Sequence, residues 1–304
     1  MSVAEDRSVV VGVDGTAAAD RAALWAARRA AVYGLPLVLV HALRWPAQAT
    51  VNLRMPSALE VLDPVGSEEP VRRWAREMVE GLAERCRAAF GVEVHTCVVP
   101  GDPADAVALA ADRTEFVVVG HSAAGGVDRL LLGSTAERLT RSCPWPVVVV
   151  RDEATAAEGR PEGPVVVGTD GSSMSDRAVR FAFRFADRSG GDVVVVHVAS
   201  SSAALLVDPV EIDTDAALRD GRGPVAEQVA RSSRLFPAVR SQMHLGTGSA
   251  ADVLLAFCAG ASLLVVGSHG KGALRRAFLG SVSHKVVNSA PCPVAVLPPA
   301  SGTA

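Results

Sequence analysis

The segment Val9-Val10-Val11-Gly12-Val13-Asp14-Gly15-Thr16 recurs 156 residues later as Val165-Val166-Val167-Gly168-Thr169-Asp170-Gly171-Ser172. A run of valines without polar alternation predicts a strand buried on both faces, which is typical of a parallel sheet. More matches follow in the same order: 38–41 with 194–197, 117–120 with 264–267 and 132–134 with 279–281. This order of matches indicates a tandem duplication.

The length of 304 residues fits two domains of ordinary size. Between the repeats, residues 151–164 read RDEATAAEGRPEGP, which is polar, contains Gly and Pro, and lacks apolar periodicity. We therefore expect domain 1 at 1–152, a linker at 153–163 and domain 2 at 164–304.

Stretches with helical spacing lie between the expected strands. The stretch at 17–33 is followed by the stop signals Gly34 and Pro36, and its counterpart in the second half is followed by Gly190-Gly191. Alternating strands and helices predict an α/β fold with two doubly wound domains, each a parallel sheet covered on both faces. Residues 43–70 and 199–223 show no such pattern and are expected to be irregular loops.

The composition excludes several classes of protein. Apolar residues make up 49% and charged residues 21%, which is globular and not disordered, and the net charge of −3 disfavours nucleic acid as a partner. No apolar run reaches the roughly 18 residues of a membrane span, and residues 1–7 lack the features of a secretory signal. The five cysteines form no CxxC pair, so we expect reduced thiols, no metal site and a cytoplasmic location.

The loop after the fourth strand of domain 2 carries a glycine motif, Gly267-x2-Gly270-x9-Gly280-Ser281. Ligands of doubly wound sheets bind at the carboxyl ends of the strands. The glycines permit a positive φ and a close approach to a ligand, and the amides at the start of the following helix form an anion site. The hydroxyls of Ser281 and Ser283 can add hydrogen bonds to phosphate, and Asp170 can accept them from a ribose or an adenine amino group.

These motifs resemble the universal stress protein family in its tandem form, over nearly the whole chain, and the spacing is similar to that of its ATP-binding subgroup. The resemblance implies an adenine nucleotide alpha hydrolase-like fold with a five-stranded parallel sheet, domains paired through the last strand, and ATP, alone or with Mg²⁺, between the first and fourth strands. It implies adenosine contacts from Asp170, Gly171 and Val198, and phosphate contacts from Gly267, Gly270, Gly280, Ser281, Val282 and Ser283. We add His269 and Lys271 of the same loop as candidate ATP contacts.

Domain 1 departs from this pattern. Its candidate residues are Asp14, Gly15, Ala42, Gly120, Ala123, Gly133, Ser134 and Thr135, with Ala123 standing where the motif requires glycine. Residues 253–304 hold four basic and no acidic residues, whereas 106–152 hold five of each. The only two lysines, Lys271 and Lys285, both belong to the basic stretch, where we expect a basic pocket. A triphosphate is strongly anionic, so we expect domain 2 to bind ATP more tightly.

Other interpretations of the same residues stay open. Asp14 and Asp170 would also serve as helix caps, and the glycine loop as a tight turn. His41 and His197 end buried strands and suit packing or loop anchoring better than ligand binding. His121 and His269 are either solvated loop residues or phosphate contacts. We expect Trp25, Trp74 and Phe181 to face the core.

The sequence therefore predicts a cytoplasmic ATP-binding regulatory protein of a stress response, without a dedicated catalytic reaction. One alternative is a slow ATPase or phosphotransferase that uses Asp14, Asp170 or the loop histidines. A second alternative is a nucleotide-free dimeric scaffold. The apolar segments 144–150 and 291–297 are expected to cover each other within one chain, and a further homodimer stays open. We expect neither nucleic acid nor membrane as a partner.

Overall fold

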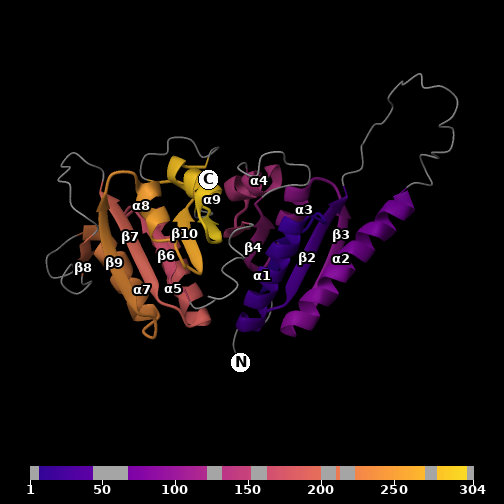
Figure 1. Ribbon diagram of the computed structural model, residues 1–304, viewed down its shortest axis with the longest axis horizontal. Coiled ribbons are helices and arrows are strands. Elements are labelled where there is room, and N and C mark those ends of the chain that lie inside the picture. Colours follow the sequence, from indigo (N-terminus) through magenta and orange to yellow (C-terminus); the bar gives the residue numbers. More distant parts are fainter. Residues whose placement is uncertain are drawn as a thin grey trace, which may run out of the picture.

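One continuous sheet runs through the whole molecule (Figure 1). The computed structural model describes residues 7–43, 68–121, 132–151, 163–199, 210–212, 223–270 and 279–299. Within these residues eleven strands follow one another in the order β3-β2-β1-β4-β5-β11-β10-β6-β7-β9-β8. The first five strands in this order belong to domain 1 and the other six to domain 2.

Domain 1 is a doubly wound parallel sheet, as the sequence predicts. Its strands are β1 (Ser8–Gly12), β2 (Leu37–Leu43), β3 (Val94–Pro100), β4 (Thr114–Gly120) and β5 (Val147–Val150), all paired in parallel. Its helices are α1 (Ala17–Tyr33), α2 (Glu68–Phe90), α3 (Pro103–Ala110) and α4 (Ser134–Ser142).

Domain 2 repeats this arrangement. Its parallel strands are β6 (Val165–Thr169), β7 (Val193–Ala199), β9 (Ser241–Thr247), β10 (Leu263–Gly267) and β11 (Val294–Leu297). Its helices are α5 (Ser173–Ser189), α7 (Gly223–Leu235), α8 (Ala250–Ala256) and α9 (Ser281–Ser289). The predicted α/β fold with five parallel strands per domain is thus confirmed.

The expectation of irregular loops after the second strands is wrong in two places. The short strand β8 (Val210–Ile212) pairs antiparallel with β9, and α2 already begins at Glu68. Three residues are too few to show the two-residue period of a strand in the sequence, so β8 forms because it can pair with the free edge of β9.

The turns at the ends of the first helix of each domain are as predicted. Gly34 (φ 64°) and Gly190 (φ 71°) adopt the left-handed conformation directly after α1 and α5. A residue with a Cβ pays a steric penalty in this region, so glycine ends both helices.

Two apolar layers lie on opposite faces of the sheet. The side chains of α1, α2, α5 and α7 pack on one face and those of α3, α4, α8 and α9 on the other. The central valines of β1, β6 and β10 are fully buried, because helices cover both faces. Phe181 is buried and Trp25 packs against the core, but Trp74 is 56% exposed, so its prediction as a core residue is wrong.

The two domains join through their last strands. β5 and β11 pair antiparallel, with Val149 opposite Val294 and Val148 opposite Ala295. This confirms the prediction that the two halves cover each other's edge within one chain. No helix in the described part of the chain has both the length and the hydropathy to cross a bilayer.

Candidate functional site

A cleft of about 530 Å³ lies at the carboxyl ends of β6 and β10, beside α8 and the start of α9. Most of the predicted domain 2 residues line it: Asp170, Val198, Gly267, His269, Gly270, Gly280, Ser281, Val282 and Ser283. Sequence reasoning missed the other lining residues, among them Thr169, Ser175, Ala250 and Leu254. Ala250 and Leu254 lie one helical turn apart on α8, and only the fold brings them opposite the glycine loop.

Two predicted features of domain 2 are placed differently, and a third is not described. Gly171 does not line the cleft but makes the turn beside it with a positive φ of 78°. Lys271 lies outside the described residues. Lys285, expected in a basic pocket, lies on α9 with its Nζ 2.5 Å from Oδ1 of Asp252, and it does not line the cleft. Its hydrogen bond to Asp252 lowers the pKa of that carboxyl.

The motif glycines allow neighbouring protein atoms to lie close to their Cα atoms. Gly267 and Gly270 do not adopt a positive φ, so that part of the prediction is wrong. A Cβ on Gly270 would lie 3.2 Å from Oδ2 of Asp170, and one on Gly280 would lie 3.2 Å from the carbonyl oxygen of Ser268. Both contacts are tighter than ordinary van der Waals spacing, so larger residues would push into the cleft or move its walls.

The start of α9 presents free backbone donors to the cleft. Its N-cap residue, Gly280, makes no side-chain capping bond, and the amides of the first turn have no acceptor within the helix. Together with the helix dipole they form an anion site. The hydroxyl of Ser283 donates to the carbonyl of Gly267 at 2.6 Å, so in this structure it fastens the loop.

The turn after β6 is fixed by its own side chains. Oδ1 of Asp170 accepts the amide of Ser172 at 2.9 Å, and Ser172 in turn caps α5 by accepting the amide of Ser175. Asp170 is therefore not the helix cap. In domain 1, Asp14 and Thr16 have the same roles before α1. His197 anchors the turn, with Nδ1 2.7 Å from the carbonyl oxygen of Thr169.

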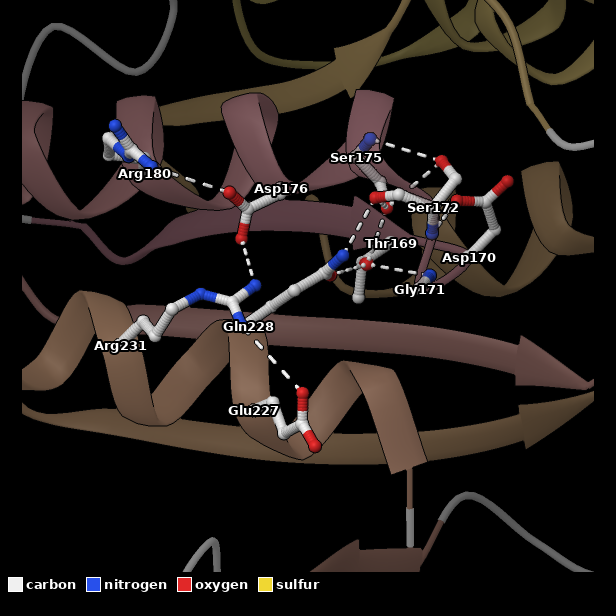
Figure 2. A network of polar contacts seen from close by, with 10 residues as sticks. All are labelled: Thr169, Asp170, Gly171, Ser172, Ser175, Asp176, Arg180, Glu227, Gln228 and Arg231. Atoms are coloured by element: carbon white, nitrogen blue, oxygen red, sulfur yellow. Dashed lines mark hydrogen bonds and ion pairs between the residues drawn. The ribbon is translucent and has the colours of Figure 1, made fainter.

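A buried polar network supports this turn (Figure 2). Gln228 of α7, 2% exposed, lies at its centre. Its Nε2 donates to the carbonyl of Ser172 at 2.7 Å, and its Oε1 accepts from the hydroxyl of Thr169 at 2.8 Å. The same hydroxyl oxygen accepts the amide of Gly171 and lies 3.0 Å from Oγ of Ser175. The network thus holds the loop that carries Asp170.

Domain 1 has a smaller cleft of about 320 Å³ at the matching place. It is lined by the predicted residues Asp14, Ala42, Gly120, Gly133, Ser134 and Thr135. Gly15 is not among the lining residues, and Ala123 lies outside the described ones. Val13 and Ala19 stand where domain 2 has Thr169 and Ser175, so this cleft lacks the polar network.

The histidines of the two halves differ in role. His41 anchors the turn of domain 1, with Nδ1 2.8 Å from the carbonyl oxygen of Val13. His121 is 3% exposed and lies at the junction of the domains, so it is neither a solvated residue nor a cleft residue. His269 lines its cleft, with Nδ1 3.0 Å from Oγ of Ser268, and within the described residues its buried Nε2 has no hydrogen-bond partner.

The comparisons with known proteins agree with this fold. The model of the Universal stress protein family matches residues 7–151 and again 163–298. A universal stress protein of Mycolicibacterium smegmatis is 33% identical over 297 residues, which cover 97% of this chain and 98% of that one. One from Mycobacterium tuberculosis is 32% identical over 299 residues, with 95% of each chain covered.

Similarity also extends to solved structures. The crystal structure of a universal stress protein from Archaeoglobus fulgidus covers 97% of this chain and 99% of its own, with a TM-score of 0.65 and 19% identity. At this identity the likeness concerns the fold. The two matches of the family model and the identity to the mycobacterial relatives show that this chain belongs to the universal stress protein family, with two family domains in tandem.

Proposed function

We propose that this protein binds ATP in the cleft of domain 2 as a regulatory ligand. The observation that carries the proposal is the meeting of three features in one cleft. These are the uncapped start of α9, the closely packed glycines Gly270 and Gly280, and the carboxylate of Asp170 on the opposite wall. The volume of about 530 Å³ lies within the range of nucleotide-sized ligand sites.

Each part of ATP has a matching group. The amides of Ser281, Val282 and Ser283 suit the phosphates, because they have no acceptor among the described residues and lie at the positive end of a helix dipole. Asp170 suits the ribose hydroxyls, since a carboxylate accepts hydrogen bonds only. Val196, Val198 and Leu254 give the cleft an apolar wall for the base. Mg²⁺ is expected to arrive with the phosphates.

Binding fits the cleft better than catalysis does. Its polar side chains already hold the protein's own backbone or one another. Oδ1 of Asp170 fixes the turn, Oγ of Ser283 bonds to the glycine loop, and Nδ1 of His269 lies against Ser268. A ligand that prefers one conformation shifts the population toward it, which is how ATP would regulate a stress response protein in the cytoplasm.

Calorimetric titration with ATP tests this proposal. We expect Gly270→Leu to weaken binding at domain 2 at least about tenfold, because the added side chain is directed at Asp170. Gly81→Leu is the matched control, since a Cβ there meets no atom within 4 Å and its φ is not positive. Equal affinities of the wild type and Gly270→Leu, or no binding by either, would reject the proposal.

A second measurement separates binding from catalysis. We expect phosphate release from Mg·ATP at the spontaneous rate. Release well above that rate, abolished in Asp170→Ala, would make the protein an ATPase in place of a binding protein.

We also propose that domain 2 binds ATP more tightly than domain 1. The basic stretch of domain 2, the larger cleft and the polar support of the Asp170 turn favour it. Denaturing the purified protein and counting released ATP measures the occupancy. One ATP per chain that is lost in Gly270→Leu is the expected result, whereas tighter binding at domain 1 would contradict this ranking.

A further inference from the structure

A reversed residue pair makes the junction of the domains asymmetric. Domain 1 reads Gly120-His121-Ser122 where domain 2 reads Gly267-Ser268-His269. The reversal moves the imidazole of domain 1 away from its cleft and into the junction. At the ends of the last strands, Arg151 of domain 1 matches Pro298 of domain 2, so domain 2 has no arginine at this matching position.

Three residues meet at this junction. Arg151 is 9% exposed, and its Nη1 lies 3.1 Å from Nε2 of His121 and donates to the carbonyl of Asn288 near the end of α9. The side-chain oxygen of Asn288 lies 3.3 Å from the same Nε2. A neutral imidazole nitrogen either accepts from Arg151 or donates to Asn288, so the ring has two alternative bonding arrangements here.

Arg151 places a positive charge at the carboxyl end of α9, where the last turn of the helix has none of its own. The last turn of α9 contains no basic residue, whereas the last turn of α4 contains its own Arg141. A cation at the carboxyl end of a helix stabilises the helix dipole, and an anion at the amino end does the same. The amino end of α9 is the part that lines the cleft of domain 2. Ligand and Arg151 therefore act on the same nine-residue helix from opposite ends.

The junction is also connected to the cleft of domain 1. The carbonyl of His121 accepts the amide of Gly133 at 2.8 Å, and the amide of His121 donates to the carbonyl of Val150 at 2.9 Å. Gly133 is the N-cap of α4 and lines the domain 1 cleft, as does Gly120 next to His121. A shift of His121 would move the backbone donors at that cleft. Figure 1 shows α9 next to domain 1 in the middle of the molecule.

We propose that α9, through Arg151 and His121, couples the two clefts, so that an anionic nucleotide at the start of α9 raises the affinity of the domain 1 cleft. This inference rests on the proposed ATP binding. The coupling is positive, because both ligation at the amino end of α9 and its bond to Arg151 favour the same ordered helix. Energetic coupling of this kind is reciprocal and amounts to about fivefold or more in affinity.

The test compares the ATP affinity of the domain 1 cleft with the domain 2 cleft filled and blocked. Calorimetry on the wild type gives the first value, and Gly270→Leu gives the second. We expect the affinity to be at least about fivefold higher in the wild type. In the Arg151→Met background the same comparison should give a ratio near one. Arg141→Met is the matched control, because that arginine ends α4 on the surface, and it should leave the ratio unchanged.

A second variant keeps the test independent of folding defects. His121→Ser introduces the residue that domain 2 has at the matching position, and it should also bring the ratio near one while thermal unfolding reports an intact fold. A ratio near one in the wild type would overturn the coupling and leave ATP binding standing. A ratio that persists in both Arg151→Met and His121→Ser would overturn it as well. Absence of ATP binding at either cleft would overturn both proposals.

Discussion

At the scale of single residues, the two domains stabilise the same turn with different side chains. Both must hold the turn that follows their first strand. Domain 2 uses Gln228, Thr169 and Ser175, all buried and hydrogen-bonded to one another or to the turn. Domain 1 has Val13 and Ala19 at the matching positions, and Met78 of α2 lies against its turn at Gly15. A buried polar network stabilises a single conformation only while each of its donors and acceptors has a hydrogen-bond partner.

We therefore expect Gln228→Met alone to lower the free energy of unfolding by about 1–3 kcal/mol, because the carbonyl of Ser172 loses one of its donors and the hydroxyl of Thr169 loses Gln228 as its acceptor. The triple variant Thr169→Val, Ser175→Ala and Gln228→Met also removes the two hydroxyls of the network and should recover part of the loss, although the amide of Gly171 then loses its side-chain acceptor. Urea unfolding of the single and triple variants measures this. A triple variant less stable than the single one would contradict the explanation.

Tyr33 gives a second prediction at this scale, because it is the only tyrosine in the chain. Burial raises its pKa from 10 to about 12. Since the folded pKa is above the unfolded one, the associated stability is complete below pH 10 and is lost as the pH rises toward 12. We expect the phenolate absorbance of the native protein to titrate near pH 12, and near pH 10 in urea. Native titration near pH 10 would show that the side chain is accessible.

At the scale of elements, helix α5 of domain 2 is held to strand β4 of domain 1 by charge. Glu115 on β4 is 3% exposed, and its carboxylate lies 2.8 Å from Nε of Arg184 on α5 and 2.9 Å from Nη1 of Arg7. The guanidinium of Arg184 also lies over the ring of Phe181, which in turn packs against Phe116 of β4. The sequence shows these residues but not their meeting, because they lie far apart in the chain.

Removal of the central carboxylate is the test of this contact. We expect Glu115→Ala to cost about 2 kcal/mol, since it leaves Arg184 partly buried without a counter-charge. Arg7 is largely exposed, so Arg7→Ala should cost less than about 1 kcal/mol and serves as the control. Thermal unfolding of both variants measures the difference. Equal effects would show that Arg184 finds another partner.

At the scale of the whole molecule, one antiparallel strand pair joins two parallel sheets. β11 lies between β5 and β10, so Ala295 faces Val148 on one side and Val265 on the other. This pair turns the last strands of both domains into central strands and leaves neither edge open at the junction. The two clefts then belong to the two halves of one continuous sheet.

Proline at Ala295 tests the pairing of β11 with β10, because Leu264 donates to the carbonyl of Pro293 and the amide of Ala295 is therefore directed at β10. We expect Ala295→Pro to cost about 3 kcal/mol or more, because it removes an amide donor from a strand that is paired on both sides. Ala295→Gly keeps the amide and should cost about 1 kcal/mol. Chemical unfolding measures both. A proline variant as stable as the glycine variant would mean that this amide does not contribute to the pairing of β11 with β10.

The sequence alone determined the fold and most of the candidate site. Valine runs without alternation identify strands buried on both faces, and Gly34 and Gly190 end helices because only their backbone tolerates a left-handed turn. The repeat predicts two similar domains, and the glycine spacing identifies the part of the domain 2 cleft that the loop after β10 and the start of α9 form. These features are local, so the physical cause and the sequence signal lie in the same few residues.

Only the tertiary structure decided how distant residues meet. Lys285 forms an ion pair with Asp252 of a neighbouring helix, and the hydroxyl of Ser283 donates to the carbonyl of Gly267. Gln228 hydrogen-bonds to a turn that lies 56 residues away in the sequence. His121 lies in a glycine loop by sequence, yet the pairing of β5 with β11 buries it against Arg151 and Asn288. Such partners depend on which elements pack together, and packing is a property of the whole chain, so no local pattern contains it.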